Sequence, residues 1–158
     1  MNPEIAAYSE SIRGRITLVY TAVEGLDERR LNWRPPFEGA NSAAAIATHA
    51  MGNAHAWVLG IACGRSVGRD RPGEFATSAD TAAELALRGR SLCGEIEAAL
   101  HELPPARLEV RLVPSQELWG EGPAREISVR DALVQAVEHA SLHLGHLHVT
   151  RDLALATL

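Results

Sequence analysis

Apolar residues recur at steps of three and four along four stretches of the chain, and proline and glycine residues lie between each stretch and the next. The stretches cover residues 3–26, 42–63, 81–103 and 128–155. This spacing places apolar side chains on one face of an α-helix. Helices of this length joined by loops favour an antiparallel four-helix bundle, in which ligand sites are built from side chains on facing helices. Because 158 residues suit one ordinary domain and not two, the sequence predicts a single all-α domain over residues 1–158.

The ends of the predicted helices carry the usual signals. Ser42 and Ser128 stand where a side-chain oxygen can cap a first helical turn, and Asp131 completes a capping box with Ser128. Three segments with closely spaced proline or glycine are expected to be loops: residues 31–40, 68–77 and 106–126. The last of these is the longest, and its alternation of leucine and valine with charged residues is a weak strand signal.

The composition excludes several functions. All 15 basic residues are arginine and the net charge is −5. A chain without lysine cannot form a Schiff base with pyridoxal phosphate or a carbonyl, and it lacks the lysine of a P-loop. Acidic residues and arginines are interspersed, which argues against a nucleic-acid partner. No apolar run approaches the roughly 18 residues of a membrane span, so we expect no membrane partner either.

The expected compartment is the cytoplasm. The first 24 residues carry acidic residues and arginine within the first turns, unlike the uninterrupted apolar stretch of a signal peptide. Cys63 and Cys93 have no metal-like spacing, and two cysteines in a cytoplasmic protein are usually reduced and buried. We therefore assign the two thiols no chemistry.

Histidines cluster in the last predicted helix. The chain has seven, and four of them lie between His139 and His148. At about 100° per residue, His139, His143 and His146 share one strip of the helix, whereas His148 points away. Two histidines four residues apart lie about 6 Å from one another at the backbone, a separation that one metal ion can bridge. Such a pair also occurs as solvated or hydrogen-bonded histidine at a helix edge, so a metal site needs a further ligand.

His49 is the candidate for that ligand. Its face of the second predicted helix is made of small or polar residues, among them Gly52 and Asn53, which leave room beside the ring. His55 lies on the far side of this helix and is expected at the surface. His101, close to a pair of prolines, is expected at a helix C-terminus, where the helix dipole favours it.

Other histidine and serine sites lack their motifs. The chain contains no HExxH zinc motif, no Glu-x-x-His pair of a di-iron bundle and no CxxCH haem attachment. No GxSxG elbow is present. A Ser-His-Asp triad stays open, because its members meet only in space.

Several of these segments together resemble a known family. Asn32-Trp-Arg-Pro, then Ile46-Ala-Thr-His49 with Trp57 two turns later, is similar to the front half of the DinB-like superfamily of DinB/YfiT-like metalloenzymes. The back half resembles the last helix of that family, which reads here His139-Ala-Ser-Leu-His143-Leu-Gly-His146. The resemblance covers about residues 3–155.

The resemblance implies a four-helix bundle with His49, His139 and His143 as metal ligands. His146 stands where many relatives have glutamine, so we expect His146 and Asn53 to lie around the ligands without binding the metal. Three imidazoles suit several divalent ions, and zinc or nickel is the expected cofactor. Relatives include transferases and isomerases that use low-molecular-weight thiols, and a homodimer is plausible for the family.

Three functions follow from such a site. The first hypothesis is a metal-dependent enzyme that transfers a small thiol to a small-molecule electrophile. The second is a metal-dependent hydrolase that uses a bound hydroxide, for which the sequence places no general base. The third is a metal- or ligand-binding protein without catalysis, such as a stress-related binding module.

A few arginine and aromatic residues have two interpretations. Arg34, Arg130 and Arg151 are candidates for contact with an acidic substrate, although exposed arginines usually form a solvated face. Trp119 and Phe75 either border the site or cover one end of the bundle. A large aromatic residue in the middle of a helix, such as Trp57, is usually part of the core.

Overall fold

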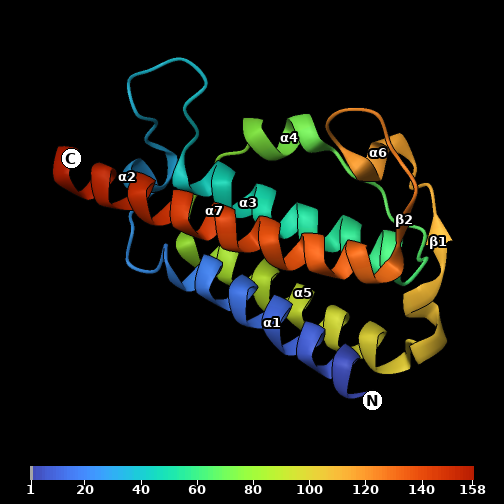
Figure 1. The fold of residues 1–158 in the computed structure, drawn as a ribbon. Coiled ribbons are helices and arrows are strands. Elements are labelled where there is room, and N and C mark those ends of the chain that lie inside the picture. Colours follow the sequence, from blue (N-terminus) through green and yellow to red (C-terminus); the bar gives the residue numbers. More distant parts are fainter. Residues whose placement is uncertain (1) are drawn as a thin grey trace.

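The computed structural model describes residues 2–158, which are mainly helical, as the all-α prediction requires. Four long helical segments make up most of the chain: α1 (Pro3–Thr21), α3 (Ala43–Ala54) with its continuation η1 (His55–Ala62), α5 (Ala82–Glu102) and α7 (Val129–Thr157). Helix α1 packs against α5 and α7, and α3 packs against α7. In Figure 1, α1 and α7 run in one direction and α3 and α5 in the other, because the segment between η1 and α5 returns the chain to the opposite end. The pairs α1–α5 and α3–α7 are therefore antiparallel, whereas α1 and α7 are parallel.

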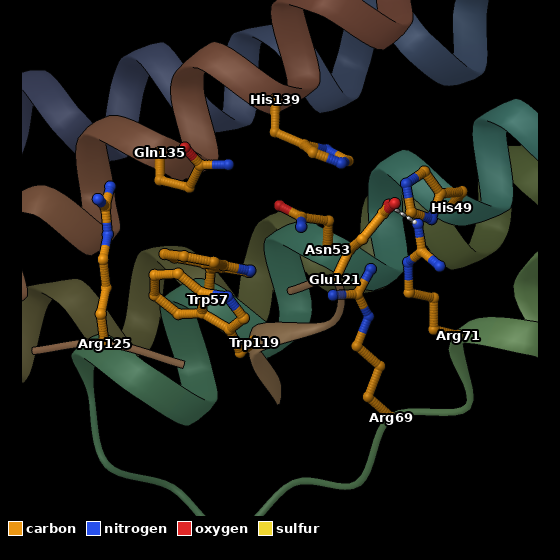
Figure 2. Close-up of a pocket in the computed structure, with 10 residues that line it drawn as sticks. All are labelled: His49, Asn53, Trp57, Arg69, Arg71, Trp119, Glu121, Arg125, Gln135 and His139. Atoms are coloured by element: carbon orange, nitrogen blue, oxygen red, sulfur yellow. Dashed lines mark hydrogen bonds and ion pairs between the residues drawn. The ribbon is translucent and has the colours of Figure 1, made fainter. Parts of the chain in front are cut away.

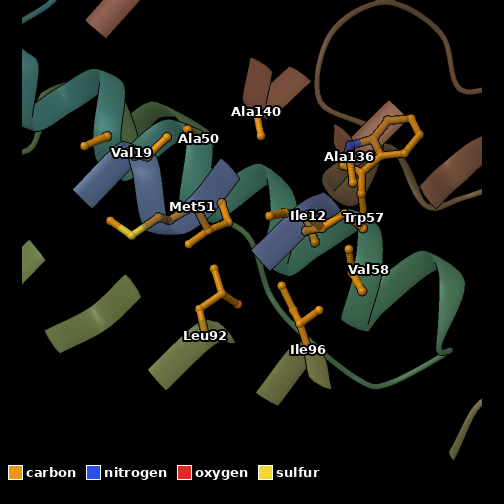
Figure 3. Packing of buried hydrophobic residues seen from close by; sticks show 14 of the residues in the cluster. Ile12, Val19, Ala50, Met51, Trp57, Val58, Leu92, Ile96, Ala136 and Ala140 are labelled. Carbon is orange, nitrogen blue, oxygen red and sulfur yellow. The ribbon is translucent and has the colours of Figure 1, made fainter. Parts of the chain in front are cut away.

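The core combines branched side chains of α1 with small side chains of α3 and α7. Ile12 and Val19 of α1 are fully buried and lie close to Met51 and Ile96 of the facing helices (Figure 3). Helix α3 contributes mainly alanine, and so does the side of α7 that carries Ala140. Small residues let two helices approach closely, which brings the polar residues at the edge of the α3–α7 contact near one another.

The predicted caps are present. The Ser42 hydroxyl accepts a hydrogen bond from the Ala45 amide at 3.2 Å. Ser128 and Asp131 form the reciprocal capping box at the start of α7, with side-chain-to-backbone distances of 3.0 and 2.9 Å. These caps satisfy amides that the first helical turn leaves without a partner, and they fix where α3 and α7 begin.

Two predicted boundaries were wrong. Helix α1 ends at Thr21 rather than at residue 26, and a turn follows that includes Gly25 at φ +79°. The short helix α2 (Glu28–Asn32) overlaps the start of the expected loop 31–40. Its N-cap is Asp27, whose carboxylate accepts from the Arg30 amide at 2.8 Å. The first predicted helix is thus shorter than expected, and a second, short helix follows the turn.

The expected loop 68–77 contains a helix. Helix α4 (Arg71–Ala76) begins after Asp70, whose side chain accepts a hydrogen bond from the Gly73 amide at 3.0 Å. Pro72 lies in the first turn, where proline costs no hydrogen bond because that amide has no partner within the helix. The Pro-Gly pair was interpreted as a break, whereas it stands at a helix start. Helix α4 packs across α3.

The long segment before α7 is ordered by short elements. A 3-10 helix η2 (Pro105–Glu109) leads into strand β1 (Arg111–Leu112), and helix α6 (Gln116–Trp119) follows. Strand β1 pairs antiparallel with β2 (Ile127–Ser128). The weak strand signal is therefore confirmed as a two-residue strand. The pairing anchors the segment beside the start of α7, with α6 against η1.

The second half of the α3 segment is a π-helix. Within η1 the Cys63 amide donates to the Val58 carbonyl at 2.9 Å, five residues back. A π-helix takes more residues per turn than an α-helix. Trp57 is consequently held on the face that carries His49 and Asn53 instead of rotating further around the axis. Among the described residues, no helix is long and apolar enough to cross a membrane.

Candidate metal site

Three histidines from two helices converge between α3 and α7. His49 on α3 and His139 and His143 on α7 each offer a nitrogen atom, and these atoms lie within 4.8 Å of one another. The ring centroids are 4.3 to 4.9 Å apart. His49 is buried, with 3% of its surface exposed, and the other two are partly buried. The group could hold one metal ion, with small shifts of the side chains that bring each nitrogen to about 2.0 to 2.1 Å from it.

A buried carboxylate holds His49 in place. Glu74 of α4 contacts His49 Nδ1 through Oε2 at 2.7 Å. The same carboxylate accepts from Arg69 Nε at 2.9 Å and from Arg69 Nη2 at 3.1 Å. Imidazole rings that bind metals usually donate their other nitrogen to such a carboxylate, which fixes the tautomer and the orientation of the ring. Glu74 was missed in the sequence because it lies within the expected loop.

The charge state of Glu74 decides which nitrogen of His49 is available to bind a metal ion. Burial raises the pKa of this carboxyl, but the hydrogen bonds from His49 and Arg69 together with the charge of Arg69 outweigh burial and leave the pKa lowered. The ionised carboxylate can only accept, so His49 Nδ1 carries the proton. His49 Nε2 then has a free lone pair for a metal ion.

The two histidines of α7 are unprotonated at neutral pH. Burial, reinforced by the neighbouring histidines and arginines, lowers the pKa of His139 to about 3 and that of His143 to about 4. Their Nδ1 atoms are buried and have no hydrogen-bond partner among residues 2–158. A neutral imidazole always keeps one unprotonated nitrogen. The three rings therefore fit a divalent metal ion.

A glycine makes room for the carboxylate. A Cβ atom added at Gly52 would overlap the Glu74 side chain, at 2.7 Å from its Cδ. The face of small residues beside His49 therefore leaves no empty space at Gly52, because the Glu74 side chain of α4 fills it. Phe75, the next residue of α4, lies with its ring centroid 4.2 Å from that of His49. Helix α4 accordingly covers one side of the histidine group.

The remaining expected site residues occupy different positions. Asn53 is buried one turn after His49, and its Oδ1 has no partner among the described residues. His146 is exposed, with its ring centroid 6.1 Å from that of His143. His101 and His148 are exposed, as expected, and His55 is half-buried rather than at the surface.

A pocket opens beside the histidine group. It has a volume of about 240 Å³, and His49 and His139 lie in its wall with Asn53, Trp57 and Trp119. Figure 2 shows the two indole rings between Asn53 and the far end of the pocket. Trp57 is both a core residue and part of this wall, whereas the sequence indicated only the core. Trp119 and Phe75 border the site, so the first of their two interpretations holds: they do not serve only to cover one end of the bundle.

The arginines of the pocket are not those expected from the sequence. Arg34 donates to backbone carbonyl oxygens, Arg130 pairs with two glutamates and Arg151 pairs with its neighbour Asp152. None of the three lines the pocket within the described part of the chain. The arginines in its wall are Arg69, Arg71 and Arg125. They lie in segments that the sequence indicated as loops, where it gives no register.

The chain belongs to the DinB superfamily, whose family model matches residues 13–147. The match spans the three histidines and most of the helical fold. No curated protein and no solved structure matches the chain. The family assignment therefore rests on the family model, and the donor set rests on the geometry described above.

Proposed function

We propose that this protein is a metal-dependent enzyme with the DinB-like four-helix bundle, which transfers a low-molecular-weight thiol to a small electrophile. The metal, zinc or nickel, is held by His49, His139 and His143. The observation that carries the proposal is the convergence of these three rings, two of which, His49 and His139, line an open pocket. Three protein ligands leave one coordination position open, as in catalytic rather than structural zinc sites.

The chemistry divides between the metal and the chain. A divalent ion in this site supplies a Lewis-acidic position that lowers the pKa of a thiol or of water. Glu74 orients His49, and burial keeps His139 and His143 unprotonated so that they can act as ligands. In the transfer, the thiol releases its proton to solvent, the sulfur–carbon bond forms, and the bond from that carbon to the leaving group breaks with its electron pair on the leaving group.

The carboxylates in and around the pocket favour thiol transfer over hydrolysis. A hydrolase needs a general base close to the bound water. Glu74 is already hydrogen-bonded to His49 and Arg69, and Glu121 is exposed and paired with Arg71 at 2.9 Å. Among the residues that line the pocket in the described chain, no other carboxylate is present. A thiolate is itself the nucleophile and needs no such base.

We also propose that the enzyme acts as a cytoplasmic homodimer. Leu142, Val149 and Leu153 follow one another along α7 at helical spacing and are 44% to 70% exposed. Apolar side chains in such a row on an outer face suit a second copy of the chain. The molar mass in solution tests this proposal, because a monomeric mass at working concentration would refute it.

The transfer is tested with metal-loaded protein, a panel of cysteine-based thiols and 1-chloro-2,4-dinitrobenzene as electrophile. We expect conjugate formation above the uncatalysed rate that requires the metal, is absent in His49→Ala and is retained in His146→Ala. Hydrolysis of 4-nitrophenyl acetate without thiol transfer would establish the hydrolase instead. Bound metal without turnover of either substrate would favour the binding protein.

A further inference from the structure

The Asn32-Trp-Arg-Pro segment lies outside the histidine group and outside the wall of the pocket within the described chain. Its polar side chains instead contact the backbone at and after the C-terminal end of α4. Arg34 Nη2 donates to the Phe75 carbonyl oxygen at 2.7 Å. Asn32 binds both backbone groups of Ala79: its Nδ2 donates to the carbonyl oxygen at 2.9 Å, and its Oδ1 accepts from the amide at 3.0 Å. The segment therefore joins α2 to the chain that leaves α4.

Helix α4 depends on polar contacts for its position. It lies across α3 on the outside of the bundle (Figure 1). Of its six residues, all within the described chain, only Glu74 is buried, and a helix this short is not stable by itself. At its N-terminal end Asp70 caps the first turn, and Arg69 binds the Glu74 carboxylate. Arg34 and Asn32 supply the contacts at the other end.

The contacts of Asn32 and Arg34 also connect this end of α4 to fixed parts of the bundle. Ala79 is 5% exposed, and a buried backbone N–H or C=O without a partner costs free energy, so one asparagine satisfies two groups that need partners. Asn32 Nδ2 donates in addition to the Glu28 carbonyl oxygen of α2 at 2.9 Å. Arg34 Nη1 donates to the Ala40 carbonyl oxygen, just before α3, at 3.0 Å. The end of α4 is thus linked to the start of the helix that carries His49.

The position of α4 decides how firmly the His49 ring is held. Glu74 Oε2 lies 2.7 Å from His49 Nδ1, and the Phe75 ring centroid lies 4.2 Å from that of His49. Hydrogen bonds of this kind extend to about 3.2 Å, so a displacement of α4 by roughly 1 Å would break the contact with Nδ1. The His49 ring would then be free to turn away from His139 and His143.

We infer that Asn32 and Arg34 are positioning residues of the metal site: they fix the C-terminal end of α4 and thereby hold Glu74 and Phe75 against His49. They act through α4 and not by contact with the metal ligands or with a substrate. The inference rests on the metal site of the proposed function and not on thiol transfer. It gives Arg34 a role other than the contact with an acidic substrate that the sequence suggested.

The first test is the zinc affinity of Asn32→Ala and Arg34→Ala, measured by competition with a chromophoric chelator on protein whose fold is checked by circular dichroism. One hydrogen bond corresponds to about fivefold in an equilibrium constant. We expect each variant to bind zinc about fivefold more weakly than the wild type, and Arg34→Lys, which keeps a donor, to lose less. The matched control is Arg29→Ala, at an exposed position of α2, which should bind zinc as the wild type does. Arg34 is exposed as well, so its variants are expected to fold.

A double-mutant cycle tests whether the effect passes through Glu74. If Arg34 acts by positioning this carboxylate, Arg34→Ala should change zinc affinity by less than about twofold in the Glu74→Gln background, because the two substitutions remove the same interaction. The full loss in that background would overturn the inference. So would Asn32→Ala and Arg34→Ala proteins that are less stable but bind zinc within twofold of the wild type, because the two residues would then be merely structural.

A second readout needs no metal. The exchange of the His49 Nδ1 proton with water is followed by NMR on metal-free protein with ¹⁵N-labelled histidine. We expect exchange to be about fivefold faster in Asn32→Ala and Arg34→Ala than in the wild type and Arg29→Ala, since the contact with Glu74 opens more often. A wild type that takes up no zinc would refute the proposed function, and the exchange rates would still test the positioning role. Zinc binding by the wild type with unchanged affinity and exchange in both variants would refute the positioning role alone.

Discussion

Replacing Glu74 with glutamine tests whether the carboxylate of α4 prepares His49 to bind a metal. The carboxylate is 8% exposed, accepts from His49 Nδ1 at 2.7 Å and binds Arg69 through two nitrogens. Glutamine has the same length and keeps one oxygen acceptor, but it loses the negative charge. The His49 ring would then be held less firmly, and its Nε2 would be a weaker ligand.

The expected loss of metal affinity follows from what such carboxylates do in other metal sites. Removing the carboxylate partner of a metal-binding histidine typically lowers metal affinity by 10- to 100-fold, or about 1.4 to 2.7 kcal/mol at 25 °C. The variant also leaves the buried guanidinium of Arg69 without its counter-charge. Truncating one partner of a buried ion pair costs about 3 to 5 kcal/mol, and the remaining amide oxygen should keep the cost of Glu74→Gln below this range.

Metal affinity is measured by competition with a chromophoric chelator, and the fold of each variant is checked by circular dichroism and thermal unfolding. The matched control is Glu97→Gln, which removes an exposed ion pair with Arg13 and should leave metal affinity unchanged. An affinity of folded Glu74→Gln within twofold of the wild type would refute the role assigned to Glu74.

Three further predictions concern packing, pH and metal removal. Gly52→Ala should destabilise the protein by about 1 to 3 kcal/mol and weaken metal binding, because the new Cβ overlaps Glu74. The control is Gly14→Ala, at an exposed position of α1 with nothing within 4 Å of an added Cβ, which should stabilise the protein by up to about 1 kcal/mol. Chemical denaturation measures the stability change of both variants, and equal changes would contradict the packing argument. The free energy of unfolding of the metal-free protein should fall as pH decreases from about 6.5 towards 4. In this interval the histidines of the unfolded chain bind protons, whereas His139 and His143 in the native state, with pKa values of about 3 and 4, do not. A flat profile over this interval would contradict the burial of these rings. Chelation should lower the melting temperature of metal-loaded protein, because the ion binds only the native state, and an unchanged melting temperature would argue against a bound ion.

The long helices could be predicted because local signals determine them. The apolar period and the capping residues Ser42 and Ser128 lie within the segments that they define. Helix α4 was missed because the Pro72-Gly73 pair fits both a loop and a first helical turn, and only its packing on α3 distinguishes the two. The change to π-helix at His55 has no signal in the apolar period either.

The candidate site was predictable to the extent that helical geometry determines it. His139 and His143 lie four residues apart on one helix, so their proximity follows from the sequence. The small residues around His49 made it a candidate, and the resemblance to the family added it to the ligand set. Glu74 and Arg125 were not predictable, because their positions depend on how the segments before α5 and α7 fold back over the helices, which is a tertiary property.

The most direct test of the metal site is the metal content of protein purified without a histidine tag or chelator. The wild type is compared with His49→Ala, His143→Ala and, as the matched control, His146→Ala. We predict near-stoichiometric zinc or nickel in the wild type and in His146→Ala, and its loss in the two other variants. A wild type that contains no metal and takes none up, or a His49→Ala variant that keeps its metal, would contradict a site shared by α3 and α7.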